Sequence, residues 1–163
     1  MTPGQITDLP YRPCVGIMLI NPQGLIFAAK RLDSTAEAPA WQMPQGGIDP
    51  GENPGLAALR ELEEEISVPP ALVAPLSESR EWLAYDLPVE MVPRMWGGRF
   101  RGQKQRWFLM RYLGQDSQID LATAEPEFCD WRWIGAAEML DAIVPFKRAI
   151  YAQVIEEFRD WLA

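Results

Sequence analysis

The sequence has 163 residues, of which 48% are hydrophobic and 23% are charged. This profile is typical of a globular protein with a sizeable core, and it predicts a single domain over residues 1–163. The net charge of −8 argues against a protein that coats nucleic acid through a broad basic surface, although a few local cations could hold one charged end. The chain has no histidine, which excludes a histidine base and histidine-ligated zinc.

The sequence also predicts a compartment. Residues 1–10 are polar and contain proline, so they do not resemble an export signal. The longest early apolar run, Val15–Ile20, is far too short to span a bilayer. We therefore expect a cytoplasmic protein without a membrane partner, in which both cysteines are reduced.

The first elements in chain order form a predicted β-hairpin. Residues 13–21 and 24–31 are two apolar runs joined across a short turn. Residues 33–40 lack periodicity and are expected to form an exposed loop. The segment 41–55 is dense in glycine and proline, which favours a shaped loop over a helix.

A helix is predicted from Pro54, a residue that suits the first helical turn. Apolar residues recur at helical spacing at Leu56, Leu59, Leu62 and Ile66. The next elements are predicted strands at residues 81–87, 105–113 and 130–134, and residues 146–163 form an expected amphipathic helix. Most tryptophans in or near these strands are expected in the core, namely Trp41, Trp82, Trp107, Trp131 and Trp133. The mixture of strands and helices indicates an α/β sandwich.

The predicted helix carries a concentrated acidic face. Glu61, Glu64 and Glu65 fall within one arc of about 100°. Like charges at this spacing repel, and hard divalent cations with oxygen ligands are a suitable counter-charge. Arg60 lies beside the patch and could orient one carboxylate, while Glu52 arrives from the preceding loop as a further oxygen ligand. An isolated acidic run is more often only a solvated helix face.

The loop before the helix makes the pattern more specific. Gly46, Glu52 and the run Arg60–Val68 resemble the Nudix box, GX5EX7REUXEEXGU, over residues 46–68. Ser67 stands where the family usually has glycine, at the position that closes the helix. This departure removes no metal ligand.

The resemblance extends over most of the chain. Segments 11–13, 41–52, 102–108, 126–128 and 145–148 resemble the bacterial RNA pyrophosphohydrolases of this family, which are related to the dinucleoside polyphosphate hydrolases. The resemblance implies an α/β/α sandwich with a mixed central sheet, in which the box forms a loop–helix–loop. It also implies a divalent cofactor, Mg²⁺ or Mn²⁺, with Zn²⁺ as a third candidate.

The resemblance assigns the metal ligands as Glu52, Glu61, Glu64, Glu65 and Glu127. The expected catalytic residues are Glu61, Glu64, Glu127 and Arg60, with either Glu61 or Glu127 taking the proton from the attacking water.

Substrate contacts are expected from a second set of residues. They are Arg12, Arg31, Gln45, Gly46, Tyr85, Val144, Phe146 and Lys147. An aromatic face opposite an arginine plane can sandwich a base. Two alternatives remain at this point. Phe146 could be a core residue at the start of a helix, and Gln42 and Gln45 could brace the loop rather than bind phosphates.

The predicted activity is conversion of a 5′-tri- or diphosphorylated RNA end to a 5′-monophosphate. The alternative substrate is a dinucleoside polyphosphate such as diadenosine tetraphosphate. A more distant alternative is a non-catalytic nucleotide sensor, but a sensor should have lost a box glutamate. All four box positions, Glu52, Glu61, Glu64 and Glu65, keep theirs.

Overall fold

A computed structural model describes residues 1–35 and 40–163 of the chain. Over these ranges the strands form one eight-stranded mixed sheet with the central order β3-β2-β1-β7-β5, while β4 pairs with β1, β6 with β7 and β8 with β2. The strands are β1 (Tyr11–Ile20), β2 (Ile26–Arg31), β3 (Trp41–Gln42), β4 (Gln45–Gly47), β5 (Val73–Glu78), β6 (Leu83–Asp86), β7 (Gly102–Tyr112) and β8 (Phe128–Ile134). Only the β1–β7 pair among them is parallel.

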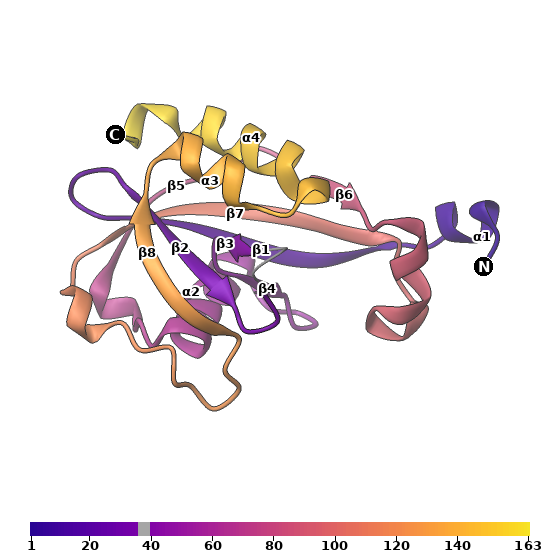
Figure 1. The fold of residues 1–163 in the computed structure, drawn as a ribbon, viewed down its shortest axis with the longest axis horizontal. Helices are drawn as coiled ribbons and strands as arrows, with labels where there is room; N and C mark the ends of the chain where they lie inside the picture. Colours follow the sequence, from indigo (N-terminus) through magenta and orange to yellow (C-terminus); the bar gives the residue numbers. More distant parts are fainter. Residues whose placement is uncertain (36–39) are drawn as a thin grey trace.

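Helices cover both faces of this sheet (Figure 1). The α-helices are α1 (Pro3–Thr7), α2 (Pro54–Ile66), α3 (Ala136–Ala142) and α4 (Arg148–Glu157). The 3-10 segments are η1 (Pro70–Leu72), η2 (Val89–Arg94), η3 (Trp96–Gly98), η4 (Asp116–Gln118), η5 (Pro145–Lys147) and η6 (Arg159–Trp161). With α3 and α4 on one face and α2 on the other, the expected α/β/α sandwich is confirmed. None of the helices in the described ranges is long and apolar enough to cross a membrane.

Two apolar cores separate the layers, because side chains alternate along each strand. In β1, Met18 and Ile20 pack under α3 and α4, whereas Ile17 and Leu19 pack against α2. Strand β7 repeats the pattern with Leu109 toward α4. The predicted hairpin is confirmed by the antiparallel pairing of β1 with β2. Residues 36–39 of the loop expected at 33–40 lie outside the described ranges.

The box helix begins and ends at capping residues. The side chain of Asn53 accepts hydrogen bonds from the backbone N–H groups of Gly55 and Leu56, and Pro54 occupies the first turn. The helix ends at Ser67, which adopts the left-handed conformation with φ 62° and ψ 28°. The serine therefore takes the backbone shape that glycine has at this position of the box.

Several sequence expectations were wrong in detail. Leu56 is 62% exposed, and the core face of α2 is formed instead by Ala57, Ala58, Leu62 and Ile66. The C-terminal segment is not one helix, since 3-10 turns flank α4. Of the five tryptophans expected mainly in the core, only Trp107 is fully buried, and Trp82 is 38% exposed.

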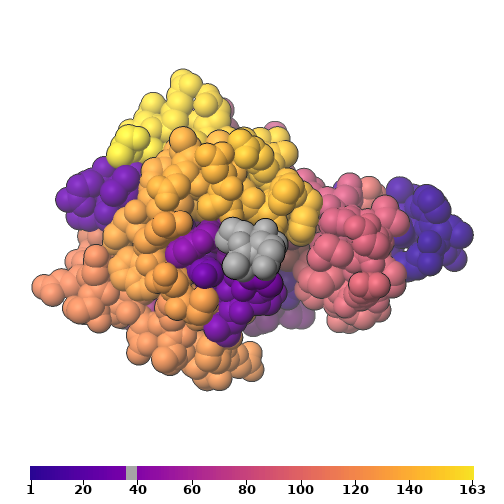
Figure 2. Space-filling model, viewed as in Figure 1, coloured from indigo at the N-terminus to yellow at the C-terminus, as the bar shows by residue number. Residues whose placement is uncertain are grey.

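One end of the molecule is formed by α1 and the segment that carries η2 and η3. Figure 2 shows these parts, indigo and pink, projecting from the rest of the surface. Arg101 links them, because its side chain donates hydrogen bonds to the backbone oxygen of Thr7 and to the carboxylate of Asp86. The η2–η3 segment therefore lies between β6 and β7, at the end of the sheet that carries the N-terminus.

Candidate active site

The acidic face of α2 is divided between buried and exposed carboxylates. Glu61 is 9% exposed and Glu65 is 4% exposed, whereas Glu64 faces solvent. Both carboxylate oxygens of Glu65 are buried and make no hydrogen bond of good geometry, although Glu127 and the backbone of Gln45 lie close to the carboxylate. A buried carboxylate without a partner is costly unless it is protonated or bound to a cation.

Burial raises the pKa of these two groups. The pKa of Glu61 rises to about 7, because burial outweighs the opposing charge of Arg60 and because Glu64 and Glu127 add their negative charges. Burial, followed by the charges of Glu127 and Glu61, raises the pKa of Glu65 well above its usual range. Negative charges act on Glu65, and Arg60 only partly offsets the burial of Glu61, a condition that a divalent cation would relieve.

Arg60 organises the loop and the helix. Its guanidinium donates two hydrogen bonds of 2.9 Å to Glu52 and one of 2.8 Å to the backbone oxygen of Gly47. It also donates to Glu61 at 2.9 Å and to Glu64 at 3.2 Å. The hydrogen bonds from Arg60 lower the pKa of Glu52 to about 2. The loop is therefore tied to the helix through one arginine.

Gly46 lies against the buried carboxylate. A β-carbon at position 46 would overlap the carboxyl group of Glu61, so only glycine leaves that carboxyl in place. Strand β4 carries Gly46 beside β1, with Val15 as its register partner. The sheet and the box helix meet at this contact.

A pocket of about 660 Å³ opens beside these carboxylates. It is lined by eleven of the residues expected from the sequence: Arg12, Arg31, Gln45, Gly46, Glu61, Glu64, Tyr85, Glu127, Val144, Phe146 and Lys147. Glu65 lies in an adjoining hollow of about 520 Å³, which shares Glu61, Glu64, Glu125 and Glu127 with the pocket. Glu52 and Arg60 line neither hollow. The carboxylates thus form the wall between two connected spaces.

The carboxylates are not gathered as ligands of a single ion. Within residues 1–35 and 40–163, no three acidic side chains form a group close enough to hold a metal. Arg60 occupies oxygens of Glu61 and Glu64, while the side chain of Glu127 is exposed. The buried oxygens of Glu65 and the negative charges of Glu127 and Glu61 nevertheless fit a hard divalent cation.

The other wall of the pocket is cationic and aromatic. The rings of Tyr85 and Phe146 lie 5.8 Å apart, and the ammonium of Lys147 lies 5.9 Å from each. Arg31 pairs with Asp33 at 2.8 Å. Burial, and then the charge of Arg31, lower the pKa of Lys147 to about 8. Phe146 therefore lines the pocket rather than serving only as a core residue.

The two glutamines both line the pocket and are hydrogen-bonded to other side chains of the protein. Gln45 accepts a hydrogen bond of 3.2 Å from Gln105, and Gln42 accepts one of 3.4 Å from Arg31. Gln105 also accepts from the indole N–H of Trp107 at 2.9 Å. A chain of polar contacts thus connects the loop to the centre of β7.

Several residues that line this pocket were not expected from the sequence. They are Asp33, Trp41, Leu87, Met91, Met95, Trp96, Gln103, Glu125 and Ile143. Glu125 could have been found, because it is two residues from Glu127 in the same acidic segment. Leu87 and the η2–η3 residues carry no recognisable motif, so their place in the pocket follows only from the fold.

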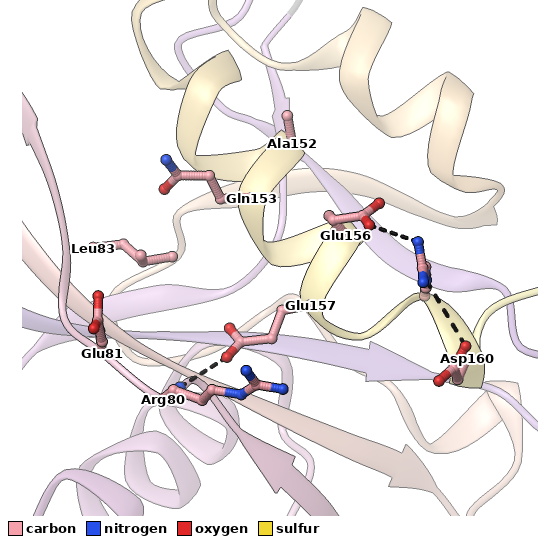
Figure 3. A pocket seen from close by; sticks show the side chains of 9 residues that line it. Arg80, Glu81, Leu83, Ala152, Gln153, Glu156, Glu157 and Asp160 are labelled. Atoms are coloured by element: carbon pink, nitrogen blue, oxygen red, sulfur yellow. Dashed lines mark hydrogen bonds and ion pairs between the residues drawn. The ribbon is translucent and has the colours of Figure 1, made fainter.

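A second large hollow, of about 880 Å³, lies between α4 and the segment before β6 (Figure 3). Three of its charged side chains satisfy one another, since Arg159 pairs with Glu156 at 2.7 Å and lies 3.9 Å from Asp160. Glu157 accepts a hydrogen bond from the backbone N–H of Arg80. None of the box carboxylates lines it, so its size does not make it the candidate active site.

Comparison with known proteins agrees with the box geometry. The family model for the NUDIX domain matches residues 10–154. The chain belongs to the Nudix family. An RNA pyrophosphohydrolase of Cereibacter sphaeroides is 59% identical over 155 residues, which cover 95% of this chain and 94% of that protein. An RNA pyrophosphohydrolase of Dinoroseobacter shibae is 54% identical, with 99% of this chain and 100% of that protein covered.

Solved Nudix structures support the fold. The Ap4A hydrolase of C. elegans in a binary complex has a TM-score of 0.64 at 16% identity, covering 91% of this chain and 98% of that one. The dihydroneopterin triphosphate pyrophosphohydrolase of E. coli has a TM-score of 0.66 at 15% identity, covering 91% and 99%. The predicted Nudix family and α/β/α fold are therefore confirmed. Nudix hydrolases generally use divalent metal ions.

Proposed function

We propose that this Nudix chain hydrolyses the 5′-tri- or diphosphate of an RNA end to a 5′-monophosphate. The observation that carries this proposal is the composition of one pocket. It joins the box carboxylates, including Glu61, to cations at Arg12, Arg31 and Lys147 and to the ring of Phe146. Carboxylates that hold a metal ion, together with cationic side chains, suit the binding of a polyphosphate, and an aromatic ring suits stacking with a nucleobase. The names of relatives at 54–59% identity support the RNA substrate.

The overall acidity of the chain is compatible with this substrate. Only the phosphorylated end has to enter the pocket, so the local cations matter more than the net charge of −8. We also propose the cytoplasm as the compartment, as expected for an enzyme of transcripts.

The metal ligands in this proposal are Glu61, Glu64, Glu65 and Glu127. When bound, an Mg²⁺ or Mn²⁺ ion would offset part of the negative charge of the phosphates and lower the pKa of the attacking water. Glu127 is exposed, and Glu64, which is also exposed, would exchange its ion pair with Arg60 for the metal, whereas Glu65 is already buried at the site. Glu52 acts through Arg60, since both of its oxygens accept hydrogen bonds from that guanidinium.

The reaction breaks one phosphoanhydride P–O bond and forms one P–O bond to water. The water proton goes to a carboxylate oxygen of Glu61 or Glu127, both of which line the pocket. Arg12, Arg31 and Lys147 hold the negative charge of the phosphates, and Phe146 with Tyr85 holds a base. The carboxylates thus serve the attacking water, while the cations and rings of the same pocket hold the substrate.

The deciding experiment compares substrates for the purified protein with Mg²⁺. We expect kcat/KM for a short 5′-triphosphorylated RNA to exceed that for diadenosine tetraphosphate. A preference for the dinucleotide by orders of magnitude would instead support the dinucleoside polyphosphate alternative. Turnover of neither substrate, together with tight nucleotide binding, would support the sensor alternative.

A further inference from the structure

The backbone of Trp96 is in an unusual conformation. Its φ is +47°, and in the described residues only Ser67 is another non-glycine with positive φ. Gly97 and Gly98 follow with φ of +69° and +71°, which permits a tight turn at this point. A bulky residue held in a left-handed conformation costs free energy, and such residues concentrate at ligand sites.

The turn directs the indole to the candidate active site. Trp96 lines the 660 Å³ pocket together with the flexible side chains of Met91 and Met95. The guanidinium carbon of Arg12 lies 5.3 Å from the centre of the Trp96 ring. The same guanidinium lies against the loop, because a β-carbon at Gly47 would contact it. One side chain, Arg12, therefore separates the indole from the box loop.

The pocket thus has two aromatic walls. One is the Tyr85–Phe146 pair with Lys147 above both rings. The other is Trp96, with Arg12 on its ring and Phe100 packed edge-on at 6.2 Å. A single nucleobase needs only one of these walls, and the first two nucleotides of an RNA end present two bases.

We propose that Trp96 is the stacking wall for the base of the first nucleotide, while Phe146, the base-holding residue of the proposed function, takes the base of the second. This assignment rests on the proposed RNA function. Arg12 reaches the box loop at Gly47, so it is suited to hold the phosphates, which are attached to the first nucleoside. The base of that nucleoside then lies nearest the aromatic ring that Arg12 contacts, which is Trp96.

The test uses three 5′-triphosphorylated RNAs: one with all bases, one abasic at the first nucleotide and one abasic at the second. For the wild-type protein we expect each abasic site to lower kcat/KM by about 10- to 100-fold, the range that base–aromatic stacking supplies. Trp96→Ala should lose a similar factor on the complete RNA and become insensitive to the first abasic site. It should remain sensitive to the second. Phe146→Ala should show the reverse pattern.

Matched variants separate stacking from folding. Trp82→Ala is the control, because Trp82 is also partly exposed and also has a cation near its ring, with Lys104 at 5.2 Å, but lies outside the pocket. It should behave like the wild type on all three RNAs. Trp96→Phe keeps an aromatic face and should retain sensitivity to the first abasic site. If Trp96→Ala does not fold, Trp96→Leu keeps apolar bulk without the aromatic face and should give the same loss.

The results also distinguish this inference from the function on which it rests. If wild-type protein cleaves the RNAs but Trp96→Ala and Trp96→Leu stay sensitive to the first abasic site, the Trp96 assignment alone is wrong. Loss of sensitivity at the second site instead of the first would also overturn it. If wild-type protein cleaves diadenosine tetraphosphate and none of the RNAs, both the proposed function and this inference fail.

Discussion

The carboxyl group of Glu61 fills the space that a side chain at Gly46 would need. Glycine at this position is therefore a requirement of the buried carboxylate, and not only of the loop conformation. Any larger residue must displace either β4 or Glu61.

Gly46→Ala should consequently inactivate the protein while leaving most of the fold. We expect kcat on triphosphorylated RNA to fall on the order of 10²-fold, as displacements of about 1 Å at a reacting centre commonly do. Gly135→Ala is the matched control, since a β-carbon there has no atom within 4 Å. Equal activity of the two variants would show that the position of Glu61 is unimportant.

Glu64→Gln should separate metal binding from folding. Glu64 is exposed, so the free energy of unfolding should change by no more than about 0.5 kcal/mol. Loss of a metal ligand should lower Mg²⁺-dependent turnover on the order of 10²-fold or more, because a catalytic cation contributes several kcal/mol. Glu63→Gln, one residue earlier on the same helix and also exposed, should stay near wild type. Turnover of Glu64→Gln near wild type would remove Glu64 from the ligand set.

Lys147 should give the protein a pH-dependent affinity for its substrate. Its pKa in the free protein is lowered to about 8, so its positive charge is present below pH 8 and disappears as the pH rises through that value. The profile of kcat/KM reports ionisation of the free enzyme. We expect wild type to exceed Lys147→Met by about 10-fold at pH 6.5, with the two converging by pH 9.5. A constant ratio across this range would mean that the charge of Lys147 does not assist binding.

At position 67, a glycine variant should be more stable than an alanine variant. The residue has φ +62°, a conformation that costs an L-residue about 1 kcal/mol or more relative to glycine. Ser67→Gly and Ser67→Ala both remove the hydrogen bond from the serine hydroxyl to the backbone oxygen of Asp120. The glycine variant should therefore be more stable than the alanine variant by about 1 kcal/mol in urea unfolding. Equal midpoints would contradict the strain.

Sequence patterns predicted the parts of the molecule that depend on local spacing. The hairpin, the box helix from Pro54 and the four box glutamates follow from periodicity or from the box itself, whereas Glu127 was expected only through the resemblance of segment 126–128. The burial of individual side chains was predicted less well. Leu56 fits the helical period but is exposed, because the core face of α2 uses the smaller Ala57 and Ala58 to approach the sheet closely. Periodicity predicts that a helix has an apolar face, but it does not predict which residues of that face contact the sheet.

The two aromatic walls of the pocket also differed in how far the sequence predicted them. Phe146 was expected through its resemblance segment, whereas Trp96 was not expected at all. Its position depends on a positive φ and on the packing of Arg12, and neither is visible in a linear pattern. The Gly97–Gly98 pair marks a turn, but a turn signal does not reveal which side chain it directs into a cavity.

The parallel ladder between β1 and β7 joins each residue to one 91 positions later, from Tyr11–Gly102 to Ile20–Arg111. During synthesis, β1 cannot pair with β7 until most of the chain has left the ribosome. Pairings of such long range slow folding, because the entropy of closing the intervening segment is lost before the contacts form. Until then the apolar run of β1 remains uncovered on that edge, where it is exposed to aggregation. Folding of the nascent protein should therefore be limited by the arrival of β7, long after the box helix has been made.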